Sequence, residues 1–129
     1  MTIKNYKISI ITVVKNSEKT IERTIKSVID QTYRNFEYII IDGGSTDNTL
    51  KILQSYKTKI DILVSGKDDG IWDAMNKSLQ YVSGDIVGFL NSGDFYYNDA
   101  LEHVNKYFNR SNINFLFGTV EKYKLMHGF

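Results

Sequence analysis

The sequence has 129 residues, and its hydrophobic (42%) and charged (24%) fractions are typical of one globular domain with a real core, which excludes a largely disordered chain. Lys and Arg number 16 against 15 Asp and Glu, and the net charge of +1 argues against nucleic-acid binding through a basic surface. Because cysteine is absent, a disulfide framework and a thiolate zinc site are excluded.

The N-terminus shows no targeting signal. Met1–Lys7 contains no apolar signal core, and no apolar run approaches the length that spans a bilayer. Together with the absence of cysteine, this favours a cytoplasmic protein.

Short apolar runs alternate with segments of helical period along the first half of the chain. Residues 8–14 and 36–41 are apolar, partly β-branched and short enough for buried strands. Between them, one apolar helix face is formed by Ile21, Ile25, Val28 and Ile29. We expect Asn16 and Ser17 to cap that helix. The second strand is followed by a helix opening at residues 46–49, whose apolar side carries Leu50, Leu53 and Tyr56.

The alternation continues through the second half. Residues 60–64 form a third predicted strand, residues 86–90 a fourth and residues 114–120 a fifth. The helix before the fourth strand is marked by Met75, Leu79 and Val82, and we expect the first two of these in the core. The helix after it carries Leu101, Val104 and Phe108.

Five strands alternating with four helices predict an α/β fold with a mostly parallel sheet, helices on both faces and right-handed crossovers. We treat residues 1–129 as one domain, because no repeat, linker or low-complexity segment interrupts the pattern. In such sheets ligands bind outside the carboxyl ends of the strands, so the loops that follow the strands form the candidate site. Three of the first four such loops contain both Gly and Asp.

The loop after the second strand is DGGSTD, residues 42–47. Part of it is expected to be a strand-to-helix turn with Ser45 or Thr46 as N-cap, worth about 1 kcal/mol. That role does not account for Asp42, whose carboxylate leaves the sheet at the ligand edge before the turn begins. Such a carboxylate can accept a hydrogen bond from a ribose hydroxyl or a base N–H, so Asp42 is a candidate ligand-binding residue.

The loop after the third strand runs into a helix start. Asp68 and Asp69 suit the positive end of a helix dipole, which is worth roughly 0.3–1 kcal/mol. Three polar residues fall within about one turn and could point together toward a pocket: Asp73, Asn76 and Lys77. Trp72 either packs at the rim of the site or lies beneath a substrate ring, and the sequence does not choose between the two.

The fourth strand is followed by Asn91-Ser92-Gly93-Asp94. These are the residue types of an ordinary turn, and on spacing alone a turn is preferred to a metal site. No Walker A, G-x-G-x-x-G or G-x-S-x-G pattern is present, so P-loop, usual dinucleotide and α/β-hydrolase chemistry is not supported.

Taken together, four stretches resemble the nucleotide-binding half of the family 2 glycosyltransferases, which are inverting enzymes with the Rossmann-like GT-A fold. They are SIITVVKN (9–16), QTYRNFEYIIIDGGSTDNT (31–49), DDGIWDAMNKS (68–78) and SGDIVGFLNSGD (83–94). Each is weak alone, but four in this order at these separations are specific. The variants look most like bacterial members that build capsule, exopolysaccharide or lipopolysaccharide.

The resemblance implies a nucleotide site. The end of the first strand, from Val13 to Lys15, would contact the base and ribose, largely through its backbone. Asp42 matches the first acid of the family's acidic pair, whereas Gly43 lacks the second, which reads the base in some relatives. The segment that lines the nucleotide and diphosphate is matched by Asp69, Asp73 and Asn76. Many relatives have a basic residue at the position of Met75, and Lys77 is expected to replace part of that charge.

The family's acidic metal motif falls on residues 91–94. Asp94 matches the acid that contacts the metal. The earlier acidic positions of the motif are occupied by Asn91 and Gly93, and we assign Asn91 to the nucleotide site. Magnesium commonly uses one or two carboxylates together with phosphate oxygens, so Asp94 suffices if a donor diphosphate supplies the rest. We therefore expect Mg²⁺ or Mn²⁺ to bind together with the nucleotide-sugar and weakly without it.

The implied reaction transfers a sugar, with inversion, from a nucleotide-diphosphate donor (UDP favoured) to a hydroxyl of a saccharide or lipid-linked acceptor. A lipid-linked acceptor would bring the protein to the inner face of the membrane, at most peripherally. The family's general base lies in a second half, beyond residue 129, so no catalytic residue is assigned and the chain is expected to be incomplete. The alternative is a non-catalytic nucleotide-sugar-binding or interaction module of the same fold. A nucleotidyltransferase is disfavoured, because its glycine-rich basic loop after the first strand is absent.

Overall fold

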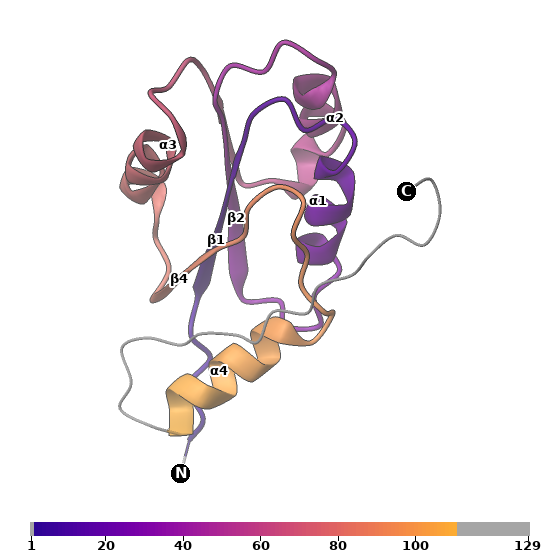
Figure 1. The fold of residues 1–129 in the computed structure, drawn as a ribbon. Helices are drawn as coiled ribbons and strands as arrows, with labels where there is room; N and C mark the ends of the chain where they lie inside the picture. The colour runs from indigo at the N-terminus through magenta and orange to yellow at the C-terminus, as the bar shows by residue number, and fades with distance from the viewer. Residues whose placement is uncertain (1, 111–129) are drawn as a thin grey trace.

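A computed structural model describes residues 2–110 and confirms the alternation of strands and helices over that range (Figure 1). The elements are β1 (Ile8–Val14), α1 (Ile21–Ile29), β2 (Phe36–Asp42), α2 (Thr49–Ser55), β3 (Ile62–Ser65), α3 (Ile71–Ser78), β4 (Ile86–Phe89) and α4 (Ala100–Arg110), with 3₁₀ turns at Lys57–Lys59 and Leu79–Tyr81. The third strand starts later than predicted, because Asp61 bonds Tyr38 through both its backbone N–H and its carboxylate. The predicted fifth strand, residues 114–120, lies outside the described residues.

The four strands form one parallel sheet in the order β3-β2-β1-β4. The chain builds the sheet in one direction from β1 to β3, and then crosses back to place β4 on the other side of β1. The strand order therefore reverses between β1 and β4, and the crevice at such a reversal is the usual ligand site of an open parallel sheet. The register brings Val14, Asp42 and Ser65 side by side at the carboxyl edge.

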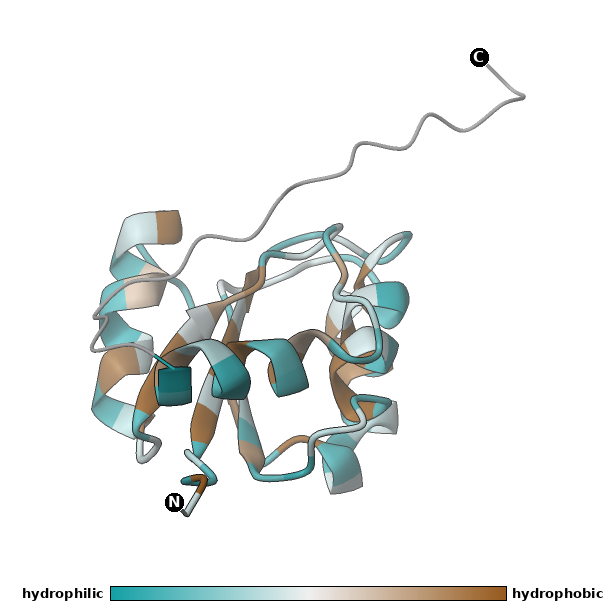
Figure 2. Cartoon of the chain, turned by 90° about the horizontal axis from the view of Figure 1, so that it is seen from below, coloured by the Kyte–Doolittle hydropathy of each residue, from teal (hydrophilic) through white to brown (hydrophobic). Residues whose placement is uncertain are grey.

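Helices cover both faces of the sheet, as predicted (Figure 1). On one face α1, α2 and α4 pack through a cluster that includes Ile25, Leu53 and Leu101, and on the other face α3 packs through Ala74. All seven residues of β1 are buried, which explains its continuous run of apolar and small residues. Figure 2 shows hydrophobic residues concentrated on the strands and hydrophilic ones on the outer surfaces of the helices.

One part of the predicted core is wrong. Leu79 is 49% exposed, and Met75 is only partly buried, although it packs against the core. The buried residues of α3 are instead Ala74 and Ser78, which lie one turn apart on the same face. Leu79 begins a 3₁₀ turn, whose tighter winding rotates its side chain away from the sheet.

A buried carboxylate links β1, β2 and the turn before β4. Glu37 accepts hydrogen bonds from the Ser9 hydroxyl (2.5 Å) and from the backbone N–H (2.7 Å) and hydroxyl (2.8 Å) of Ser83. The Ser9 hydroxyl in turn accepts the N–H of Gly84 at 2.8 Å. Burial alone would raise the pKa of Glu37, but the hydrogen bonds from Ser9 and Ser83 and the nearby Lys7 ammonium outweigh it and lower the pKa.

The substitution Glu37→Gln is expected to lower the free energy of unfolding by about 1–3 kcal/mol at neutral pH, because its amide presents N–H groups where the carboxylate accepts. Since the folded pKa of Glu37 is depressed below its ordinary value of 4.5, its stabilisation is present above that pH and is lost as pH falls through the folded pKa. Urea unfolding should therefore show that the difference in the free energy of unfolding between the unsubstituted chain and Glu37→Gln is smaller in acid than at neutral pH. The matched control is Glu102→Gln on the exposed surface of α4, and a pH-independent difference would contradict the linkage.

Candidate functional site

Four loops meet at the carboxyl edge of the sheet, where the candidate site was predicted. They follow β1, β2, β3 and β4 and contain residues 15–20, 43–48, 66–70 and 90–99. Between the loops after β1 and β2, side chains of one loop bond the backbone of the other, so the shapes of these two loops depend on each other.

Asn16 joins the first loop to the second. Its backbone adopts a left-handed conformation (φ 49°), and its side-chain oxygen accepts the N–H of Thr46 at 2.8 Å. Its own N–H donates to the hydroxyl of Ser45 at 2.8 Å. The prediction that Asn16 and Ser17 cap the first helix is therefore wrong: the N-cap of α1 is Thr20, and Asn16 is used between the loops.

Val13 and Lys15, both predicted to contact a nucleotide, lie at the reversal of strand order. Val13 is buried in the core that faces α3, so only its backbone is available to a ligand. Lys15 is exposed at the edge of the sheet. This placement agrees with a contact made largely through the backbone, and the contact itself stays a prediction.

Asp42 ends β2 and is fully buried (0% exposed). Its Oδ2 accepts the N–H groups of Gly44 and Ser45, both at 3.1 Å, and the hydroxyl of Ser65 at 2.7 Å. Its Oδ1 accepts the hydroxyl of Ser45 at 2.5 Å. The carboxylate therefore shapes the loop and retains little free capacity to accept a bond from a ligand. The predicted contact of Asp42 with a ribose or base stays a prediction.

The predicted cap of the second helix at Ser45 or Thr46 is wrong. The N-cap of α2 is Asn48, and the first helical N–H, that of Thr49, donates to the carboxylate of Asp47 at 2.8 Å. Ser45 is not available for this role, because its hydroxyl donates a hydrogen bond to the carboxylate of Asp42 at the end of β2.

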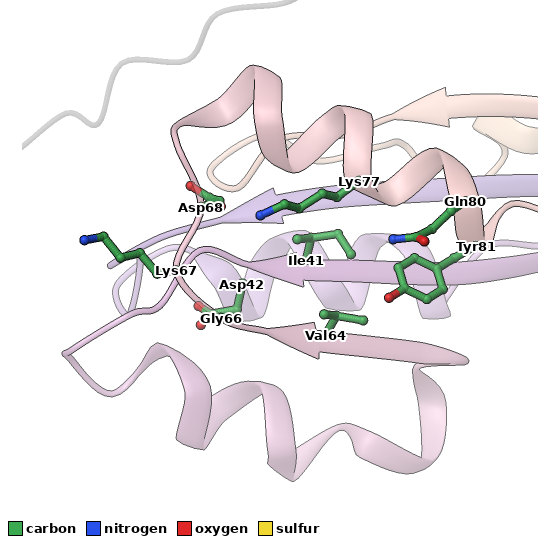
Figure 3. Close-up of a pocket in the computed structure, with 9 residues that line it drawn as sticks. All are labelled: Ile41, Asp42, Val64, Gly66, Lys67, Asp68, Lys77, Gln80 and Tyr81. Atoms are coloured by element: carbon green, nitrogen blue, oxygen red, sulfur yellow. The ribbon is translucent and has the colours of Figure 1, made fainter.

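A pocket lies between the ends of β2 and β3 and the helix α3 (Figure 3). Ile41 and Val64 form an apolar surface on the side of the sheet, and Tyr81 closes one end. At the other end, nearest the loops, Figure 3 shows the Lys77 side chain extending toward Asp68. The pocket thus combines an apolar floor with two acidic residues, Asp42 and Asp68, and two basic residues, Lys67 and Lys77.

The first turns of α3 contain an ion pair. The Asp73 carboxylate accepts the N–H of Asp69 at 2.9 Å and contacts the Lys77 ammonium at 3.0 Å. The Asp69 N–H, and then Lys77, lower the pKa of Asp73, and Asp73 raises the pKa of Lys77. Of the predicted group of three, Asp73 and Lys77 are joined by this ion pair, but only Lys77 lines the pocket, and Asn76 is exposed. Trp72 is 79% exposed.

The loop after β4 is anchored on α1. Gly93 has a left-handed backbone (φ 97°), and its N–H donates to the hydroxyl of Thr24 at 3.0 Å. The same hydroxyl donates to the carbonyl of Asp94 at 2.8 Å, and Arg23 donates to the carbonyl of Gly93 at 3.2 Å. Neither Thr24 nor Arg23 was predicted; the available signal for Thr24 was a hydroxyl within the apolar face of a helix.

Asp94 is the candidate metal ligand of this loop. Its carboxylate is exposed, and within residues 2–110 no hydrogen bond or ion pair engages it. Asn91, at the other end of the turn, is exposed as well and accepts the Asp94 N–H through its carbonyl at 3.1 Å. Across the part of the chain that the structure describes, no group of three or more acidic or histidine side chains could hold an ion. A single free carboxylate fits Mg²⁺ or Mn²⁺ when a diphosphate supplies further oxygens.

One known protein family matches the sequence over all four loops of the candidate site. The family model for glycosyl transferase family 2 matches residues 9–128. The chain belongs to this family. The UDP-Glc:alpha-D-GlcNAc-diphosphoundecaprenol beta-1,3-glucosyltransferase WfgD of Escherichia coli is 36% identical over 118 residues, covering 91% of this chain and 47% of WfgD. The putative teichuronic acid biosynthesis glycosyltransferase TuaG of Bacillus subtilis is 39% identical over 98 residues, 74% of this chain and 39% of TuaG. The chain spans less than half the length of these relatives.

Solved structures confirm the predicted GT-A fold. S. aureus TarS in complex with UDP-GlcNAc superposes with a TM-score of 0.75 at 28% identity, covering 81% of this chain and 31% of the TarS chain. Glucosyl-3-phosphoglycerate synthase of Mycobacterium tuberculosis, with Mn²⁺, UDP and phosphoglyceric acid, has a TM-score of 0.58 at 31% identity over 67% of this chain and 33% of its own. A Pyrobaculum calidifontis mannosyltransferase (TM-score 0.69, 22% identity, 74% of this chain and 30% of its own) supports the fold alone.

The substitution Asp42→Ala is expected to lower the free energy of unfolding by about 2–4 kcal/mol, because it leaves the N–H groups of Gly44 and Ser45 without their acceptor. Urea unfolding measures the loss, and amide exchange at those two residues should accelerate. The matched control is Asp69→Ala, an exposed acid of the next loop, which should change stability by less than about 0.5 kcal/mol. Equal effects of the two substitutions would show that Asp42 does not hold the loop.

Proposed function

We propose that this chain is the donor-binding part of an inverting glycosyltransferase that transfers a sugar from a nucleotide-diphosphate donor to an acceptor hydroxyl in bacterial surface polysaccharide synthesis. The observation that carries the proposal is the reversal of strand order between β1 and β4. Asn16 follows β1, Asp94 follows β4, and the pocket lies at the ends of β2 and β3, so all three are at the carboxyl edge of the sheet. The names of the E. coli and B. subtilis relatives support the polysaccharide assignment.

A UDP-sugar is the donor that we favour. TarS has been solved with UDP and with UDP-GlcNAc at 28–29% identity to this chain, and the mycobacterial synthase with UDP and Mn²⁺ at 31%. In this chain, the apolar surface of Ile41 and Val64 suits one face of a planar base. We assign further contacts with the base and ribose to the backbone from Val13 to Lys15.

The diphosphate would lie between the pocket and the loop after β4. We assign Asp69, Asn76 and Asn91 to its surroundings as exposed polar groups. Asp73 would act through Lys77, because their ion pair at 3.0 Å holds the ammonium beside the pocket, where it can face an anionic ligand. Asp42 holds the neighbouring loop in shape through its four hydrogen bonds.

Asp94 would hold a divalent metal, Mg²⁺ or Mn²⁺, together with the oxygens of the diphosphate. A metal bound in this way supplies Lewis-acid stabilisation of the leaving diphosphate. The contribution of the chain itself is the defined turn, in which Thr24 and Arg23 bind the carbonyls of Asp94 and Gly93. We therefore expect Asp94 to set the metal dependence of nucleotide binding.

The acceptor that we propose is a saccharide or a lipid-linked saccharide, since the E. coli relative is named for a substrate on diphosphoundecaprenol. None of the helices within residues 2–110 is long and apolar enough to cross a membrane. We assign no general base to a described residue. The alternative function, a nucleotide-sugar-binding module without transfer chemistry, would share the donor site and differ only in lacking sugar transfer.

Calorimetric titration of the chain with UDP, with and without Mn²⁺, tests the donor site. We expect UDP to bind more tightly with Mn²⁺, and Asp94→Ala to remove this metal dependence, because the exposed carboxylate is its only protein ligand in the proposal. The matched control, Asp99→Ala in the same loop, removes a carboxylate that pairs with His103 and should leave the dependence intact. Failure of a panel of nucleoside diphosphates to bind at saturating metal would end the donor-site proposal.

A further inference from the structure

Gly43 leaves room for a side chain of another loop. A β-carbon on Gly43 would lie 2.5 Å from Oδ2 of Asp68, 3.1 Å from its Cγ and 3.2 Å from its Oδ1. The Asp68 carboxylate therefore occupies the volume that any side chain at position 43 would enter. The φ angle of Gly43 is not in the left-handed region, so the backbone does not call for glycine here, and the absent side chain matters through the Asp68 carboxylate, which would have to move to admit one.

Asp68 is accessible to a ligand in a way that Asp42 is not. The Asp42 carboxylate is fully buried and accepts four hydrogen bonds. Asp68 is half-buried and lines the pocket, and its Oδ1 accepts the N–H of Gly70 at 3.0 Å. Its Oδ2 accepts no hydrogen bond from residues 2–110. One carboxylate oxygen is thus held by the loop, while the other lies next to Gly43 and accepts no hydrogen bond from residues 2–110.

We propose that Asp68 selects the base of the donor nucleotide by accepting a hydrogen bond from the N3–H of uracil. This inference rests on the proposed donor-site function, and it assigns base selection to a residue of the β3–α3 loop. Gly43 is the permissive partner, because only a residue without a side chain lets the Asp68 carboxylate stand where it does.

The Asp68 carboxylate at the loop end of the pocket matches the edge of uracil (Figure 3). That edge presents an N3–H donor, from which the carboxylate can accept a hydrogen bond. Cytosine presents an unprotonated N3, whose lone pair would face the carboxylate. A site built to accept a hydrogen bond rejects a ligand that lacks the donor, which favours uracil over cytosine.

The first test compares the affinities of the chain for UDP and CDP, by calorimetry at saturating Mn²⁺. The unsubstituted chain should prefer UDP. In Asp68→Asn the amide can donate to the N3 of cytosine, so the ratio of the affinity for UDP to the affinity for CDP should fall by about tenfold or more, through weaker UDP binding and stronger CDP binding. The matched control is Asp30→Asn, an exposed acid at the end of α1, which should leave the ratio unchanged.

The second test exchanges the residues at positions 43 and 68. Gly43→Asp alone should weaken UDP binding, because the new side chain competes with Asp68 for one volume and adds a like charge. The double substitution Gly43→Asp with Asp68→Gly returns a single carboxylate to that region and should restore the preference for UDP over CDP. Urea unfolding of each variant shows whether the fold is retained.

The outcomes separate this inference from the proposed function. A chain that binds neither nucleotide would overturn both. A chain that binds UDP and CDP equally would overturn the inference and leave the donor site in place. An unchanged ratio in Asp68→Asn, or an equal loss of affinity for both nucleotides, would show that Asp68 acts only on its own loop through Gly70 and would also overturn it.

Discussion

The buried carboxylate of Asp42 is the constraint on which the candidate site depends. It bonds Ser45 within its own loop and Ser65 at the end of β3, so one loop and the ends of two strands share an anchor. A buried charge is tolerated only when hydrogen bonds replace its lost hydration, and four donors do so here. Asn16 holds the same loop from the side of β1. The wall of the pocket therefore has a defined shape before any ligand is present.

The two halves of the site belong to opposite faces of the sheet. The pocket lies on the face covered by α3, where Ala74 and Ser78 are the buried, small residues of the helix. The loop that contains Asp94 is anchored by Thr24 of α1, on the other face. A donor bound as proposed would therefore cross the carboxyl edge from one face to the other. The reversal of strand order between β1 and β4 lies along this path, at the position where open parallel sheets usually bind ligands.

Much of the fold was predictable because local pattern and tertiary structure agree. The β-branched run of β1 and the apolar face of α1 lie where the sequence indicates. The errors arose where a side chain had two possible partners. Ser45 and Asn16 have the residue types of helix caps, but each bonds an atom of a different loop. Leu79 has helical spacing, yet the chain tightens into a 3₁₀ turn at that residue.

The sequence by itself determined the alternation of strands and helices, the parallel sheet, and the carboxyl edge as the place where polar residues gather. These follow from periodicity and from the handedness of parallel crossovers, which are local or general properties. Only the tertiary structure decided which acids are free. Asp42 and Asp68 are alike in the sequence, but Asp42 is buried among three donor groups of its own turn and the Ser65 hydroxyl that strand register brings beside it, whereas one oxygen of Asp68 accepts no hydrogen bond from residues 2–110 and lies beside Gly43. The burial of Asp42, the position of Ser65 and the contact between Asp68 and Gly43 depend on how the strands and loops pack, which no local pattern records.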